Sequence, residues 1–180
     1  MTATAAPVAI ATWTIDPAHS ELTFRIRHLI GKVRGRFTGF AGTLTADPAQ
    51  LAEGRVEVTI EATTIDTANA MRDEHLRSPD FFDVATFPTI AFASRALRVD
   101  GERLVVEGDL TLRGVTRPVT LTGEALGQVR DPWGQDRLLF EAAGSIDRRE
   151  FGIVFNQTLD TGTLLGDTVE IGITLQAIRQ

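Results

Sequence analysis

The chain has 180 residues and a formal net charge of −6, with 18 basic and 24 acidic side chains. This length fits one domain, and the acidic balance argues against a nucleic-acid-binding protein, which normally presents a basic face. The sequence contains no cysteine, which excludes disulfides, thiolate nucleophiles and cysteine-ligated zinc. Ten phenylalanines without a tyrosine favour a dry interior, because a buried phenyl ring leaves no hydroxyl group in need of a partner.

Residues 1–10 show neither the basic segment nor the uninterrupted apolar run of a secretory signal. The first basic residue is Arg25, and Pro7 interrupts a short stretch rich in alanine and threonine. Nowhere does an apolar run approach the roughly 18 residues that span a bilayer. We therefore predict a disordered tail at residues 1–10, a single domain at residues 11–180 and a cytoplasmic protein.

Apolar and polar residues alternate with a period of two along most of the chain, which predicts antiparallel strands with one buried face. The runs with this pattern are residues 22–28, 32–37, 39–44, 55–62, 90–94, 104–112, 119–125, 138–146 and 169–177. Turn residues separate several runs, as at Asp100-Gly101, Arg113-Gly114 and Leu165-Gly166-Asp167. Eight or nine such strands can hide their apolar faces in a sandwich or in a closed barrel, and closure also removes the sheet edges.

One segment between the fourth and fifth runs breaks the alternation. Residues 67–77 are rich in good helix formers, and Asp66 or Thr67 can act as the N-cap. We predict one short helix around residues 67–77, with Phe81 and Phe82 anchoring the chain where it leaves the helix.

The predicted inner faces mix phenylalanine with glycine. They include Phe24, Phe37, Phe40, Phe92 and Phe140, together with Gly35, Gly42, Gly108, Gly123, Gly144 and Gly172. Glycines at such positions bend strands, and we expect them to leave volume unfilled. An eight-stranded barrel is just wide enough to be filled by side chains or to hold one small ligand. The pattern therefore permits an apolar cavity.

Several short motifs follow one another in a distinctive order. They are Trp13-x-Ile15-Asp16-x-x-His19-Ser20, Gly35-x-Phe37, Arg72-Asp73-x-His75-Leu76, Asp80-Phe81-Phe82-Asp83, Gly108-Asp109-Leu110-Thr111-Leu112-Arg113-Gly114 and Asp147-Arg148-x-x-Phe151-Gly152. Together they resemble the YceI-like family of polyisoprenoid-binding proteins from about Trp13 to Ile178. The resemblance implies an extended, lipocalin-like antiparallel barrel of about eight strands around a long apolar pore. It also implies that the barrel binds a polyisoprenoid or a similar long-chain lipid for sequestration, storage or transport.

Binding of this kind needs burial more than chemistry, since each buried CH₂ group contributes about 0.8 kcal/mol. An anionic headgroup would favour arginine or histidine near the barrel mouth, and His28, Arg72, His75 and Arg148 are candidates. We predict no cofactor, no catalytic residue and no metal ligand. The predicted ligand contacts are Phe24, Ile26, His28, Phe37, Phe40, Ile60, Arg72, His75, Phe81, Phe82, Phe92, Leu110, Leu112, Phe140 and Arg148.

Two other functions stay open at this point. An enzyme acting on such a lipid would use His28, His75 or Asp160, and a stress-related interaction module would have a filled core. Asp160 lies in an Asp-Thr-Gly sequence typical of aspartic proteases, but the residues around it indicate a hairpin loop.

Basic residues recur at alternate positions between residues 25 and 36. Such side chains could contact phosphate groups or a membrane surface. Alternation places them on an outer face, where Glu57 and Glu61 of a neighbouring run favour cross-strand charge pairing instead. Peripheral membrane contact and homodimerisation both stay open.

Overall fold

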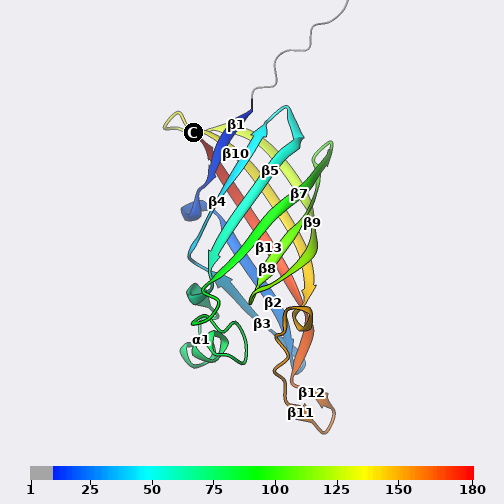
Figure 1. The fold of residues 1–180 in the computed structure, drawn as a ribbon. Coiled ribbons are helices and arrows are strands. Elements are labelled where there is room, and N and C mark those ends of the chain that lie inside the picture. Colours follow the sequence, from blue (N-terminus) through cyan, green and yellow to red (C-terminus); the bar gives the residue numbers. More distant parts are fainter. Residues whose placement is uncertain (1–9) are drawn as a thin grey trace, which may run out of the picture.

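The computed structural model describes residues 10–180, which form a closed antiparallel β-barrel with one α-helix (Figure 1). Neighbouring strands pair in the order β1-β4-β5-β7-β8-β9-β10-β13, and β13 pairs back onto β1. The strands are β1 (Ala11–Ile15), β4 (Phe40–Asp47), β5 (Gln50–Glu61), β7 (Thr89–Asp100), β8 (Arg103–Leu112), β9 (Val115–Arg130), β10 (Asp136–Asp147) and β13 (Leu165–Arg179). The predicted barrel of about eight strands is confirmed, and the sandwich is not formed.

Of the tail predicted at residues 1–10, the structure describes only Ile10. Residues 1–9, which make up most of the predicted tail, lie outside the described residues, and Ile10 is exposed just before β1. The alternation predicts no strand before residue 22, so β1 is missed by the sequence pattern. Its Trp13 and Ile15 are nevertheless buried on the inner face.

The barrel is extended at one end because β13 pairs with two different strands. Its last residues pair with β1, whereas residues 165–174 pair with β2 (Glu21–His28), which follows β1 after the 3-10 turn η1 (Pro17–His19). β2 forms a hairpin with β3 (Gly31–Phe37), whose end pairs with the short β6 (Ile65–Asp66). The β2–β3 hairpin and the beginning of β13 therefore extend towards the end that carries α1 (Figure 1).

The helix α1 (Ala70–Arg77) begins three residues later than predicted. Asn69 is the N-cap, with its side-chain oxygen accepting a 3.0 Å hydrogen bond from the Arg72 N–H. Neither Asp66 nor Thr67 can take this role, because Asp66 is paired in β6 and Ala68 has a positive φ of 58° that interrupts the chain before the helix. After the helix, Phe81 is buried, as predicted for an anchor.

The glycines of the inner faces do not leave the empty volume that was predicted. A Cβ atom on Gly35 would lie 2.3 Å from the Phe24 ring, and one on Gly108 would lie 2.5 Å from the Phe92 ring. In both cases a phenyl ring from the neighbouring strand occupies the space above the glycine backbone. Glycine and phenylalanine are thus complementary parts of one wall, and the cavity has a different origin.

The segment after η3 (Arg148–Phe151) holds one correct prediction and one wrong prediction. The expected hairpin is confirmed as β11 (Thr158–Leu159) paired with β12 (Gly162–Thr163), with Asp160 exposed at its turn. The turn predicted at residues 165–167 is wrong, because β13 already begins at Leu165 and shifts register against β2 before Val169. The remaining short element is the 3-10 turn η2 (Ala62–Thr64).

The charge pairing predicted for the basic run is correct in kind and wrong in partner. Arg25 and Lys32 both pair with Glu170 of β13, at 2.7 and 3.0 Å. Glu57 and Glu61 lie on β5, which pairs with β4 and β7 and not with β2 or β3. Barrel topology therefore supplies a carboxylate from the last strand of the chain.

Candidate functional site

A cavity of about 660 Å³ runs through the interior of the barrel, and all eight barrel strands contribute to its wall. This volume falls within the range of about 300–1,000 Å³ that is usual for small-molecule sites. The filled core expected for an interaction module is therefore contradicted. The cavity is the part of the barrel interior that the inner side chains of the eight strands do not fill.

The cavity is apolar along the part of its wall that lies away from α1. Leu44, Leu97 and Leu104 lie in this part of the wall. Beyond it, Leu44 packs with Trp13, which is 0% exposed, in a buried cluster that fills the barrel. A hydrocarbon chain could be accommodated here without leaving a polar group unsatisfied.

The polar part of the wall lies at the opposite end, around α1 and the tip of the β2–β3 hairpin. Met71 belongs to this wall and is 86% exposed, so the cavity opens beside the helix. We call this end the mouth; it comprises α1, the β2–β3 turn and residues 148–165. The polar side chains of the wall are Thr23, His28, Asn69, Arg72, His75, Arg148 and Gln157. A cavity that is apolar inside and polar at its mouth matches an amphiphilic ligand.

Arg72 is held at the mouth with part of its guanidinium group unused. Its Nε and Nη2 donate hydrogen bonds of 2.8 Å to the hydroxyl and the carbonyl oxygen of Thr67. The Thr67 hydroxyl in turn donates to the buried carboxylate of Asp73, which fixes its orientation. Within the described residues Nη1 has no hydrogen-bond partner and Arg72 forms no ion pair. These free donors fit an anionic or carbonyl oxygen of a headgroup.

His75 is also fixed in position. Its Nε2 lies 2.8 Å from a carboxylate oxygen of Asp80, and its ring packs edge-on against Phe81 and Phe155, with centroids 5.1 and 4.9 Å apart. His28 and His75 both line the cavity but share no hydrogen bond, and Asp160 lies outside the wall at the β11–β12 turn. The structure therefore does not bring these three alternative candidates together, and each of them stays a prediction by itself.

Arg148 is buried, with 3% of its surface exposed, and it braces the mouth from within. Its Nε donates to the carbonyl oxygen of Gly166 at 2.9 Å, and its Nη1 donates to those of Ile153 and Phe155 at 3.0 and 2.7 Å. Nη2 reaches Asp167 at 3.3 Å, and burial lowers the pKa of this guanidinium. The observed role of Arg148 is to hold the loop after η3 against β13, whereas contact with a ligand stays a prediction.

The structure places fourteen of the fifteen predicted contact residues in the cavity wall, and their role in binding stays a prediction. Phe40 is the exception, since it packs with Ile15 and Leu22 in a buried cluster. Alternation assigns a residue to the inner face but cannot tell whether it faces open space or other side chains. The pattern also misses two residues of the cavity wall. Phe155 lies in a loop, where no periodicity marks an inner face. Met71 lies on the helix, and the sequence does not tell which side of the helix faces the barrel.

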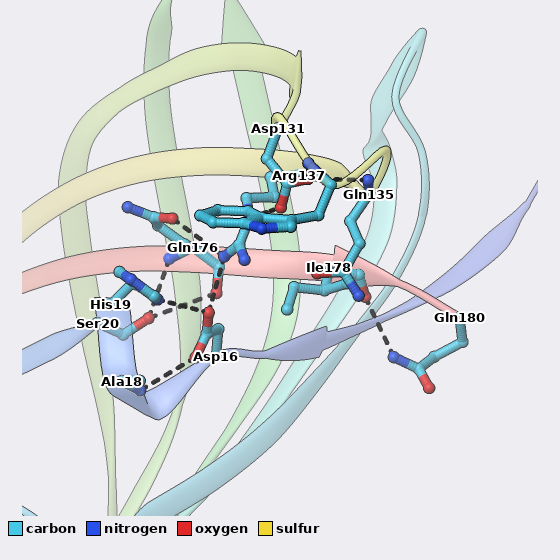
Figure 2. Close-up of polar contacts among 11 residues, drawn as sticks. Asp16, Ala18, His19, Ser20, Asp131, Gln135, Arg137, Gln176, Ile178 and Gln180 are labelled. Atoms are coloured by element: carbon cyan, nitrogen blue, oxygen red, sulfur yellow. Dashed lines mark hydrogen bonds and ion pairs between the residues drawn. The ribbon is translucent and has the colours of Figure 1, made fainter.

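A compact polar network lies at the other end of the barrel and outside the cavity (Figure 2). Arg137 of β10 forms ion pairs with Asp16 at 2.7 Å and with Asp131 of the β9–β10 turn at 2.8 Å. Asp16 also caps η1 by accepting hydrogen bonds from the Ala18 N–H and the ring of His19. The hydrogen bonds from Arg137 lower the pKa of both carboxyl groups.

This network ties the first turn of the chain to the last strands of the barrel. Arg137 also donates to the side-chain oxygen of Gln176 on β13 (Figure 2). Together with the cluster around Trp13, it forms what we call the closed end.

Residues 10–180 contain no group of three or more histidines and carboxylates that could hold a metal ion. In the same part of the chain, no helix is long and apolar enough to cross a membrane. The cytoplasmic location and the homodimer stay predictions.

Comparison with known proteins gives one consistent result. The sequence profile of the YceI-like domain matches residues 13–177. Protein YceI of Escherichia coli O157:H7 is 46% identical over 136 residues, which cover 75% of this chain and 71% of that protein. Among solved structures, BcnA of Burkholderia cenocepacia has a TM-score of 0.80 at 25% identity, covering 90% of this chain and 98% of BcnA.

A more distant structure shares the fold. A polyisoprenoid binding domain from Saccharophagus degradans, implicated in plant cell wall breakdown, superimposes with a TM-score of 0.68 at 16% identity. The match covers 95% of this chain and 99% of that domain. At this identity the likeness shows a common fold only.

Proposed function

The chain belongs to the YceI-like domain family, and from that premise we propose that it binds a long-chain isoprenoid-type lipid inside the barrel and so sequesters, stores or carries it. The observation that carries this proposal is the polarity of the cavity. Its interior wall is built mainly from leucine, isoleucine, valine and phenylalanine, and its polar side chains other than Thr23 lie at or next to the mouth. A lipid tail would lie inside the barrel with its headgroup near Arg72.

Burial of the tail supplies the affinity. Each CH₂ group taken from water contributes about 0.8 kcal/mol, and the rigid barrel wall needs little reorganisation to receive it. The isoprenoid class is supported by the polyisoprenoid binding domain that shares this fold, and an unbranched acyl chain is the main competitor.

Two probes of similar length separate these ligand classes. We expect geranylgeraniol, a branched isoprenoid alcohol, to raise the unfolding temperature of the purified chain more than hexadecanol does. A ligand at 100 times its Kd stabilises the folded protein by about 2.7 kcal/mol, which a thermal melt detects readily. Native mass spectrometry and extraction into organic solvent would identify any lipid that copurifies with the protein.

Adjacent alanines on β10 provide a matched pair of variants. Ala142 lines the cavity, whereas Ala143 is exposed on the outer face. We expect Ala142→Phe to abolish stabilisation by geranylgeraniol because the new ring occupies the lumen, and Ala143→Phe to retain it. Equal responses of the two variants, or a wild-type protein that is ligand-free and is stabilised by neither alcohol, would contradict binding in the lumen.

A further inference from the structure

Large apolar side chains are exposed around the mouth. Ile30 is fully exposed, Val154 is 62% exposed, and Leu29 and Met71 are exposed as well. Met71 lines the cavity, Leu29 and Ile30 follow the lining residue His28, and Val154 lies between two lining residues. We call Leu29, Ile30, Met71 and Val154 the apolar rim. All four belong to the mouth as defined above.

The turn between β2 and β3 consists of two residues that are unfavourable in such a turn. His28 pairs with Gly31, so that Leu29 and Ile30 form a two-residue turn, and Leu29 has a positive φ of 54°. Such turns favour asparagine, aspartate and glycine, which adopt a positive φ at little cost. A branched leucine there is strained, and an isoleucine beside it leaves its whole side chain in water. The strain at Leu29 therefore lowers the stability of the fold, and Ile30 adds no buried surface to it.

Charge distinguishes the same hairpin from the rest of the chain. Residues 21–37 hold five basic residues and one acidic residue, a formal charge of +4 within a chain of −6. Arg36 pairs with Asp66 at 3.2 Å, but within the described residues Arg27 and Arg34 form no ion pair. The apolar turn residues Leu29 and Ile30 are therefore flanked along β2 and β3 by arginines whose positive charge is not neutralised by an ion pair.

We propose that the mouth docks onto the surface of an anionic lipid bilayer, with Leu29 and Ile30 inserted and the arginines of the hairpin against the lipid phosphates. An apolar tip and a cationic stem are the two elements that interfacial membrane binding requires. The apolar rim lies at the mouth, where Met71 and the neighbours of Leu29 and Val154 line the cavity, so docking would bring the mouth against the lipid. A protein partner would explain the exposed apolar residues but not their position at the mouth of an apolar cavity.

Vesicle co-sedimentation tests this proposal without requiring any ligand in the lumen. We expect the full chain to bind vesicles that contain phosphatidylglycerol and to bind pure phosphatidylcholine vesicles much more weakly. Ile30→Ser should lower the affinity about tenfold because one buried aliphatic side chain is lost. Arg34→Gln should lower it about fivefold, and added salt should weaken binding further.

Trp133→Ser is the matched control, because Trp133 is 83% exposed on the β9–β10 turn at the closed end. We expect it to bind vesicles as the wild type does. Equal binding to both kinds of vesicle, or an equal loss in Trp133→Ser and Ile30→Ser, would overturn the proposal. So would a chain that forms dimers in size-exclusion chromatography until Ile30→Ser dissociates them without any vesicle binding.

This proposal goes beyond binding in the lumen, and the two can fail separately. Ala142→Phe should lose stabilisation by geranylgeraniol while it still sediments with phosphatidylglycerol vesicles. Ile30→Ser should still be stabilised by geranylgeraniol, and unchanged thermal unfolding of the ligand-free variant would show that the fold is intact. A vesicle-binding loss in Ala142→Phe that matches the loss in Ile30→Ser would contradict a separate docking surface.

Discussion

The two ends of the barrel use similar residues in opposite ways. At the closed end Trp13 is completely buried, and Arg137 is surrounded by two carboxylates. At the mouth Ile30 is fully exposed, and Arg72 keeps donors without a partner in the described chain. The closed end gains stability from burial and charge neutralisation, whereas the mouth leaves apolar and cationic groups in contact with water.

Three arginines illustrate how the partner determines the role. Arg137 is neutralised by Asp16 and Asp131, and Arg148 is occupied mainly by backbone carbonyl oxygens. Arg72 is positioned by Thr67, a neutral residue that fixes its geometry, and it forms no direct ion pair among the described residues. The same kind of side chain thus joins strands at the closed end, whereas at the mouth Arg148 braces a loop and Arg72 keeps donors without a partner among the described residues.

The largest effect on stability is expected at the closed end, where truncation of Trp13 opens a cavity. Trp13→Ala should lower the free energy of unfolding by about 3–5 kcal/mol, because the indole ring packs with Leu44, Leu138 and Ala177. Trp133→Ala removes the same group from an exposed turn and should change it by less than about 0.5 kcal/mol. Urea denaturation of both variants measures the difference. Similar losses would mean that the closed end is not the stabilising part of the barrel.

Neighbouring arginines at the base of the mouth provide the next comparison. Arg148→Met should lower the free energy of unfolding in urea by about 3 kcal/mol, because it removes the charged partner of one buried and two partly buried carbonyl groups. Amide hydrogen exchange should rise first in the loop that contains Ile153 and Phe155. Arg149→Met should have almost no effect, because Arg149 is exposed and its ion pair with Asp167 spans 3.8 Å. Exchange that rises uniformly over the barrel would contradict a local brace.

The Arg137 network should make the closed end sensitive to acid. The pKa values of Asp16 and Asp131 are lowered in the folded protein, so their contribution to stability is complete above the ordinary value of 3.8 and is lost as the pH falls through the lowered values. Arg137→Gln should therefore destabilise the protein at pH 7, by less than Arg148→Met does, and the difference from wild type should shrink below pH 3.8. Urea denaturation across this pH range measures it. A constant difference at all pH values would indicate that Arg137 acts through packing alone.

Local patterns were enough to predict antiparallel strands with one buried face, but they left a sandwich and a barrel open, and only the family resemblance implied the barrel. Leu22, Phe24 and Ile26 alternate clearly, and β2 lies where they indicate. β1 was missed because its five residues follow a stretch rich in alanine and threonine and end before Asp16-Pro17, which leaves too short a run to recognise. Strand prediction therefore failed for β1, whose residues are buried by strands that lie far from it in the sequence.

Contacts between residues far apart in the sequence could not be predicted in the same way. Lys32 pairs with Glu170, which is 138 residues away, and nothing in either local sequence indicates this. Likewise Phe40 and Phe92 have the same alternating pattern, yet only Phe92 faces the cavity. Topology determines both outcomes, since it decides which strands are adjacent and how far apart opposite walls lie.

The smallest expected change in stability has the opposite sign and sharpens the contrast between the two ends. Leu29→Asn should raise the free energy of unfolding by about 0.5–1 kcal/mol, because asparagine adopts the positive φ of this turn with less strain than leucine. The same variant should bind phosphatidylglycerol vesicles more weakly, since it removes an apolar side chain from the inserted tip. Urea denaturation and co-sedimentation of one protein preparation measure both effects. If Leu29→Asn instead lowers the free energy of unfolding, Leu29 stabilises the fold by packing. The strained turn would then not be explained by membrane contact.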